Sequence, residues 1–198
     1  MNTHAVSSDA GAFGDDYFSQ IARAASLVSR DALRSAAELL IATHHRGSLV
    51  FTCGNGGSAA IANHSVTDHC KLVQTDTGLA PRVVSLSSTV EIMTAISNDL
   101  SYAEVFEYQL RSLAKPQDTL LVISSSGDSE NVVRAARWAK DNQVNVIGLT
   151  GFAGGRVAGL ADVNLHVESN NYGVVEDVHQ SVSHILAQFI HASHAAGD

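Results

Sequence analysis

The sequence contains few of the residues that mark several large classes of protein. Its two cysteines, Cys53 and Cys70, form neither a C-x-x-C pair nor a disulfide framework. Its 12 lysines and arginines stand against 20 acidic residues, which gives a net charge of −8, and the basic residues are not clustered. Because nucleic-acid binding rests on neutralising phosphates, we expect no nucleic-acid partner.

Long apolar runs are also missing. No stretch reaches the roughly 18 apolar residues of a membrane-spanning helix, and the amino end, MNTHAVSSDAGAFGDD, has no signal-peptide pattern. We therefore expect a reduced, cytoplasmic protein with no membrane contact and with a flexible segment over residues 1–14. Hydrophobic residues still make up 45% of the 198 residues. That share is enough for one domain with a sizeable core, which we place at 15–195.

Short apolar runs alternate with helical patterns along the chain. Helical spacing over Tyr17–His45 predicts one long helix or two abutting ones, and a last helix runs from Val174 to about Ser193. Continuous apolar strands between helices are typical of a parallel sheet covered on both faces. The sequence therefore predicts an α/β domain with extra helices at both ends and five strands, at 48–53, 82–87, 119–125, 144–151 and 163–168.

Two turns at predicted strand ends are rich in glycine and serine. The first, CGNGGS, ends at Ser58, which opens a helix with free backbone N–H groups. The second, ISSSGDSEN, gathers hydroxyl groups at the start of another helix, and these come from Ser124, Ser125, Ser126 and Ser129. Either turn alone is explained by helix capping. Two of them in one parallel sheet favour an anion site built from hydroxyls, backbone amides and helix dipoles.

Ionisable side chains recur at helical spacing on two predicted helices. His64 and Asp68 are four residues apart and share a face, and so do Glu176, Gln180 and His184. Facing helices with these groups suit a four-ligand zinc site, and they equally suit a general acid and base beside a carbonyl. A surface ion pair is the alternative for His64 and Asp68. We interpret the histidines of HHRG (44–47) and HASH (191–194) as solvated helix ends.

Several motifs together resemble the sugar isomerase (SIS) domain family, and within it the sedoheptulose-7-phosphate isomerases, also called phosphoheptose isomerases. They are CGNGGSAAIANH, ISNDLSYAEVF, ISSSGDSENVVRAARWA, VIGLTGFAGGRVAGLADV and HQSVSHILAQ, which occur in the family's order over about residues 15–192. The resemblance implies a flavodoxin-like, five-stranded parallel sheet and a homotetramer whose active sites are shared between subunits. It also implies conversion of sedoheptulose 7-phosphate to glycero-manno-heptose 7-phosphate through an enediol(ate), towards heptose for lipopolysaccharide or other glycans.

The resemblance also carries site residues onto this sequence. Zn²⁺ or another divalent metal is expected on His64, Asp68, Glu176 and His184, and the catalytic groups are expected to be Asp68, His184 and Glu176. The expected substrate-binding residues are Asn55, Gly56, Gly57, Ser58, Asn98, Asp99, Ser124, Ser125, Ser126 and Ser129.

Two positions depart from the family pattern. Asp68 stands where the family has a glutamate, and Glu176 stands where it has a glutamine. Either carboxylate could therefore be the base. An isomerase of a pentose or hexose phosphate, and a non-catalytic SIS-domain phosphosugar-binding or adaptor protein, are the alternatives.

Overall fold

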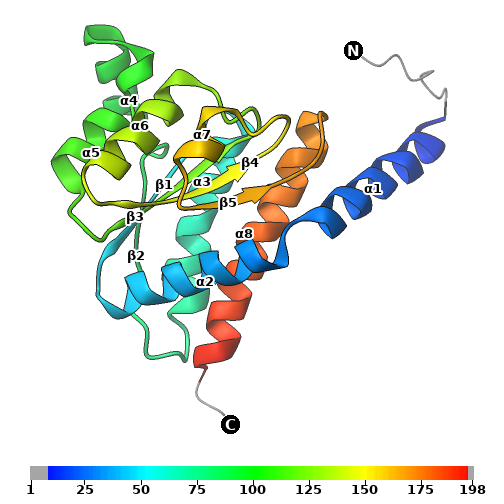
Figure 1. Cartoon of the computed structure of the whole chain (residues 1–198), viewed down its shortest axis with the longest axis horizontal. Helices are drawn as coiled ribbons and strands as arrows, with labels where there is room; N and C mark the ends of the chain where they lie inside the picture. Colours follow the sequence, from blue (N-terminus) through cyan, green and yellow to red (C-terminus); the bar gives the residue numbers. More distant parts are fainter. Residues whose placement is uncertain (1–8, 196–198) are drawn as a thin grey trace.

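The centre of the computed structural model, which describes residues 9–195, is a five-stranded sheet (Figure 1). All strands are parallel, in the order β2-β1-β3-β4-β5, which is the flavodoxin-like order. The predicted parallel sheet is confirmed. The strands are β1 Leu49–Cys53, β2 Arg82–Ser85, β3 Thr119–Ser124, β4 Asn145–Thr150 and β5 Val163–His166.

Helices cover both faces of this sheet, and the alternation of side chains along β3 divides the core in two. Leu121 and Ile123 pack into one hydrophobic cluster with α1, α2, α3 and α8, while Leu120 and Val122 pack into a second with α4, α5, α6 and α7. The helices are α1 Ala10–Leu27, α2 Arg30–His45, α3 Gly57–Thr67, α4 Val90–Asp99, α5 Glu107–Leu113, α6 Glu130–Asp141, α7 Gly155–Leu160 and α8 Tyr172–His194.

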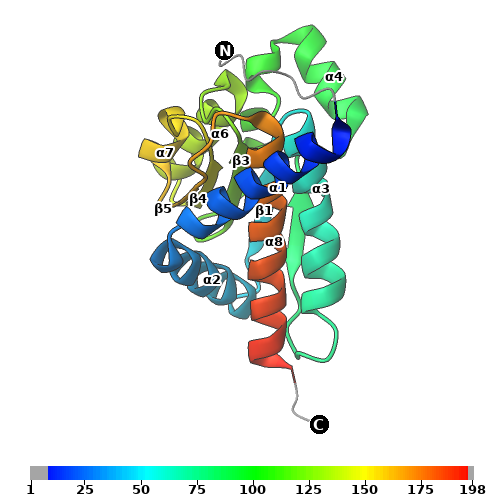
Figure 2. The same cartoon turned by 90° about the vertical axis from the view of Figure 1, so that its right-hand side faces the viewer.

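The amino-terminal region forms two abutting helices. Ser29 caps α2 by accepting a hydrogen bond from the Ala32 amide, and Asp9 caps α1. Residues 10–14, which the sequence analysis assigned to the flexible segment, form the start of α1, whereas residues 1–8 lie outside the described part of the chain. Figure 2 shows α1 crossing α8, where the Tyr17 hydroxyl donates a hydrogen bond to Asp177.

Two short helical elements complete the description. α3 continues as a π-helix, η1 Asp68–Val73, and a 3₁₀ turn, η2 Tyr102–Glu104, follows α4. Within residues 9–195, every helix falls short of the length and apolar character needed to cross a bilayer.

The predicted solvated position of His44 is wrong. The side chain is buried by the packing of α2, and its Nε2 lies 3.1 Å from Nδ1 of the buried His69 in η1. Burial, followed by the nearby histidines 45 and 194, lowers the pKa of His44 to about 4. His45 is exposed, and His191 and His194 are partly exposed.

Candidate active site

The two serine- and glycine-rich turns meet at one edge of the sheet. They follow β1 and β3, which are neighbouring parallel strands, so their carboxyl ends lie side by side. Between them lies a pocket of about 120 Å³. Its walls are formed by Asn55, Ser58, Ser124, Ser125, Ser126, Ser129, Tyr172 and Glu176.

Most of the described side chains that line this pocket can donate hydrogen bonds, and Glu176 is the one carboxylate among them. α3 and α6 both begin at it, and neither N-cap residue, Gly56 or Ser129, caps its helix with a side chain, so amides at the two helix starts can bind a ligand. The Ser125 hydroxyl is buried without a hydrogen-bond partner among the described residues. No lysine or arginine of residues 9–195 lines the pocket. Amide dipoles and hydroxyls thus favour an anion here.

Close backbone packing holds the second turn in place. Gly127 has φ +64°, and a Cβ there would overlap the carbonyl oxygen of Gly154. The amides of Gly151 and Val157 donate hydrogen bonds of 2.9 Å to the carbonyls of Ser125 and Gly127. The loop before α7 and the first turn of α7 therefore hold the serine turn in place.

A second group of side chains lies where α3 and η1 meet α8. His64 Nε2 lies 3.2 Å from Asp68 Oδ1 and 3.0 Å from His184 Nε2. His184 Nε2 is 3.8 Å from Asp68 Oδ2. The two helices predicted to carry these residues therefore do face each other, and we call the three residues the His–Asp–His group.

The His–Asp–His group fits a divalent metal ion. One ligand atom from each residue lies within 4.8 Å of the others, and the Oδ2 atom of Asp68 is buried with no hydrogen-bond partner among the described residues. Two imidazole nitrogens and a carboxylate oxygen are a donor set that suits Zn²⁺. The Gln180 amide lies 2.8 Å from His184 Nε2. Its spacing of one helical turn from His184 was the signal for this neighbour, to which the sequence analysis gave no role.

Glu176, the expected fourth ligand, does not join this group. Eight residues of α8 separate it from His184, a rise of about 12 Å, and its carboxylate lies in the serine pocket, over Gly57. The geometry therefore brings together three of the four expected ligands. Burial, and then the charge of Asp177, raises the pKa of Glu176.

The remaining expected residues lie around the first turn and on α4. Gly56 precedes α3 with φ +55°, and Gly57 begins the helix. Asn98 and Asp99 are exposed at the end of α4, where the Asn98 amide donates to the Asp99 carboxylate, and neither lines the pocket. Tyr102 reaches the turn instead, with its hydroxyl 2.8 Å from Asn55 Oδ1. Nothing in the sequence spacing singled out Tyr102 or the pocket residue Tyr172.

The chain is similar in sequence to known proteins. The SIS domain family model matches residues 16–151. The chain is 37% identical over 170 residues to the phosphoheptose isomerase of Alteromonas mediterranea, which covers 84% of this chain and 85% of that protein. It is 38% identical over 160 residues to the phosphoheptose isomerase of Helicobacter hepaticus, and the alignment covers 80% of this chain and 81% of that protein.

The fold is also similar to that of solved structures. The phosphoheptose isomerase of Neisseria gonorrhoeae superposes with a TM-score of 0.81 at 31% identity, over 92% of this chain and 96% of that one. The enzyme from Francisella tularensis gives a TM-score of 0.83 at 29% identity, with the same coverage of 92% and 96%. The chain therefore belongs to the SIS domain family, among its phosphoheptose isomerases.

Proposed function

We propose that this protein isomerises sedoheptulose 7-phosphate to glycero-manno-heptose 7-phosphate. The observation that carries the proposal is the pairing of an anion pocket with an acid–base group on the same helix. Ser58 in the pocket and His64 in the His–Asp–His group are six residues apart on α3, a separation of about 9 Å. A sugar phosphate lying along α3 would then have its phosphate at one end of this span and its carbonyl at the other.

The serine pocket would hold the phosphate. Ser58, Ser124, Ser126 and Ser129, with the amides at the starts of α3 and α6, would donate to its oxygens. The substrate's carbonyl end would then extend along α3 towards the His–Asp–His group.

His64, Asp68 and His184 would hold Zn²⁺ or another divalent ion. Such a cation polarises the carbonyl and the adjacent hydroxyl and so acidifies the neighbouring C–H bond. These three residues also orient the reacting end of the sugar, because all three project from packed helices.

We assign the base to Asp68. It takes the proton from C1 of the ketose, which leaves an enediolate, and returns a proton to C2 to give the aldose. His184 moves the proton between the two sugar oxygens. Asp68 is favoured over Glu176 because Asp68 lies in the His–Asp–His group, whereas Glu176 lies at the phosphate end of the site.

Matched amide substitutions test this assignment. We expect Asp68→Asn to lower kcat by about 10²-fold or more, the usual contribution of a general base. Glu176→Gln should change KM and leave kcat within about tenfold, because it removes a charge beside the phosphate. Metal content and melting temperature are the controls for Asp68→Asn. If Glu176→Gln abolishes turnover in protein that retains its metal, Glu176 is the base and the assignment to Asp68 fails.

His184→Gln should abolish turnover in a folded protein. Conversion is followed by NMR with the seven-carbon ketose phosphate and with a panel of five- and six-carbon phosphosugars. If a shorter sugar phosphate is turned over faster, that sugar, and not the seven-carbon ketose phosphate, is the substrate. Binding without turnover of any sugar would favour the non-catalytic alternative.

The proposal includes the homotetramer with shared active sites and a cytoplasmic location. Two observations support burial of α1 and α8 against other subunits. Phe13 and Phe18 on α1 and Ile185 and Phe189 on α8 are more than half exposed. A largely apolar cavity of about 370 Å³ also lies between α1, α2 and α8. The cysteines of the described region are unpaired, which suits a reducing compartment.

A further inference from the structure

One buried side chain behind the serine pocket has no role in the site as described so far. Asn131 is 2% exposed in the first turn of α6. Its amide pairs with that of Asn55 in both directions, because each Nδ2 donates to the other residue's Oδ1 over 2.9 Å. Asn55 belongs to the first turn and Asn131 to the helix after the second, so this pair joins the two halves of the pocket.

The backbone decides which way this amide pair points. The Val132 N–H donates to Asn131 Oδ1 over 3.0 Å, and an N–H can only donate, so that atom must be the oxygen. The Nδ2 of Asn131 therefore faces Asn55, and the Asn55 atom that accepts from it must be Oδ1. The Tyr102 hydroxyl donates to the same oxygen over 2.8 Å. Both acceptor positions of Asn55 Oδ1 are then filled.

The Asn55 side chain has one hydrogen-bond donor left for a ligand. Its Nδ2 carries two hydrogens, one of which goes to Asn131, and the second has no partner among the described residues. Asn55 lines the serine pocket. If the amide rotated by half a turn, it would present an oxygen to an anion there, which is repulsive. The Asn131 amide opposes that rotation, because two Nδ2 groups would then face each other, and the rotation would also break the hydrogen bond that the Tyr102 hydroxyl donates to Oδ1.

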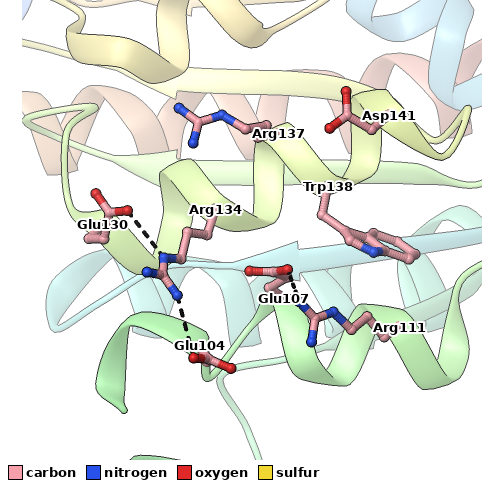
Figure 3. Close-up of a pocket in the computed structure, with 8 residues that line it drawn as sticks. All are labelled: Glu104, Glu107, Arg111, Glu130, Arg134, Arg137, Trp138 and Asp141. Carbon is pink, nitrogen blue, oxygen red and sulfur yellow. Dashed lines mark hydrogen bonds and ion pairs between the residues drawn. The ribbon is translucent and has the colours of Figure 1, made fainter. Parts of the chain in front are cut away.

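Tyr102 is itself held from outside the pocket. Its 3₁₀ turn, η2, lies on α6, where Arg134 bridges Glu104 and Glu130 at 3.5 and 3.2 Å (Figure 3). Arg134 and Asn131 both belong to α6. α6 thus anchors η2 by an ion pair, and it also carries Asn131, whose Nδ2 donates to the same Asn55 Oδ1 as the Tyr102 hydroxyl.

We propose that Asn131 and Tyr102 are positioning residues that fix the Asn55 amide with an N–H directed at the phosphate of the bound sugar. The proposal rests on the proposed function for the identity of the ligand. The hydrogen bonds on which it is built do not depend on that function.

Tyr102→Phe tests the proposal because it removes one hydroxyl and leaves the packing of the ring. Its matched control is Tyr108→Phe, since Tyr108 is 43% exposed on α5 and lines neither the serine pocket nor the His–Asp–His group. The first readout is the ¹⁵N–¹H₂ resonance pair of the Asn55 side chain in ligand-free protein. The second is the Kd for inorganic phosphate, and the third is kcat and KM for the sugar phosphate.

We expect Tyr102→Phe to shift the Asn55 resonances and to raise the Kd for phosphate and KM by about three- to tenfold, the size of a lost hydrogen bond. Its kcat should stay within about twofold, and Tyr108→Phe should match the parent in all readouts. Asn131→Ala should have the larger effect, and in its background Tyr102→Phe should add less than it does alone. Melting temperatures show whether each variant is folded.

Unchanged Asn55 resonances in Tyr102→Phe would overturn the proposal. A shift of the resonances with unchanged phosphate affinity would also overturn it, because the amide would then not face the ligand. If the parent protein binds phosphate but isomerises no sugar, the proposed function fails while the expected changes in resonances and Kd still support the positioning role.

Discussion

Substitution of Gly127 by alanine should damage both the stability of the fold and the affinity of the serine pocket. Gly127 has φ +64°, where a residue with a Cβ costs about 1–2 kcal/mol. The added methyl group would overlap the Gly154 carbonyl, which is backbone and cannot rotate away. Overpacking of this kind costs about 1–3 kcal/mol. The total loss of about 2–5 kcal/mol should lower the melting temperature on the order of 10 °C for a domain of this size.

The same change should weaken phosphate binding. Relief of the overlap moves Gly127 away from the loop before α7 and strains the bonds from Gly151 and Val157. The serine hydroxyls on this turn then lose their alignment, so we expect KM to rise at least tenfold and kcat to fall less. The assays are differential scanning fluorimetry and steady-state kinetics on the same preparation.

Gly159→Ala is the matched control. A Cβ at Gly159 meets nothing within 4 Å, and the residue lies in α7 without a positive φ. This substitution should leave KM unchanged and stabilise the protein by up to about 1 kcal/mol. If Gly127→Ala keeps the parent's KM and melting temperature, the close packing described here does not position the serine turn.

Three further predictions concern metal, pH and assembly. Zn²⁺ should raise the melting temperature of the parent protein and EDTA should reverse the rise, whereas His64→Gln should abolish it; an equal rise in that variant would place the metal elsewhere. Because burial lowers the pKa of His44 to about 4, its stabilising neutral form is complete above pH 6.5 and is lost as pH falls towards 4. In denaturant titrations, the free energy of unfolding should fall by up to about 3 kcal/mol over this pH range because of His44. The fall should be smaller in His44→Gln and the same as in the parent in the exposed-site control His45→Gln. If the protein forms the proposed homotetramer, Phe18→Ser should lower the mass measured by light scattering, since Phe18 is 69% exposed in the single chain; an unchanged mass would remove this side chain from the proposed interface.

The elements that depend on local pattern could be predicted from the sequence. All residues of β3 are buried, which is why its apolar run TLLVIS indicates a central parallel strand. Both serine- and glycine-rich turns are also local, because each combines glycine, serine and a helix start. The spacing of His64 and Asp68 predicted a shared face correctly.

What the sequence could not provide were contacts between distant segments. His44 contacts His69 of η1, and the helical pattern of the sequence around His44 does not predict that contact. Glu176 and His184 share a helix, but only the position of α3 shows that one meets the serine pocket and the other the His–Asp–His group. The pairing of Asn55 with Asn131 joins two turns that are far apart along the chain. Such contacts follow from the packing of helices on the sheet.

The central claim, that the site performs an isomerisation through an enediolate, is tested most directly by solvent exchange. Metal-replete protein is incubated with sedoheptulose 7-phosphate in D₂O, and product and label are followed by NMR. The account predicts a new aldose 7-phosphate with deuterium at C2, and loss of both in Asp68→Asn. An aldose product that carries no solvent deuterium under any condition, or no product although the sugar phosphate binds, would contradict it.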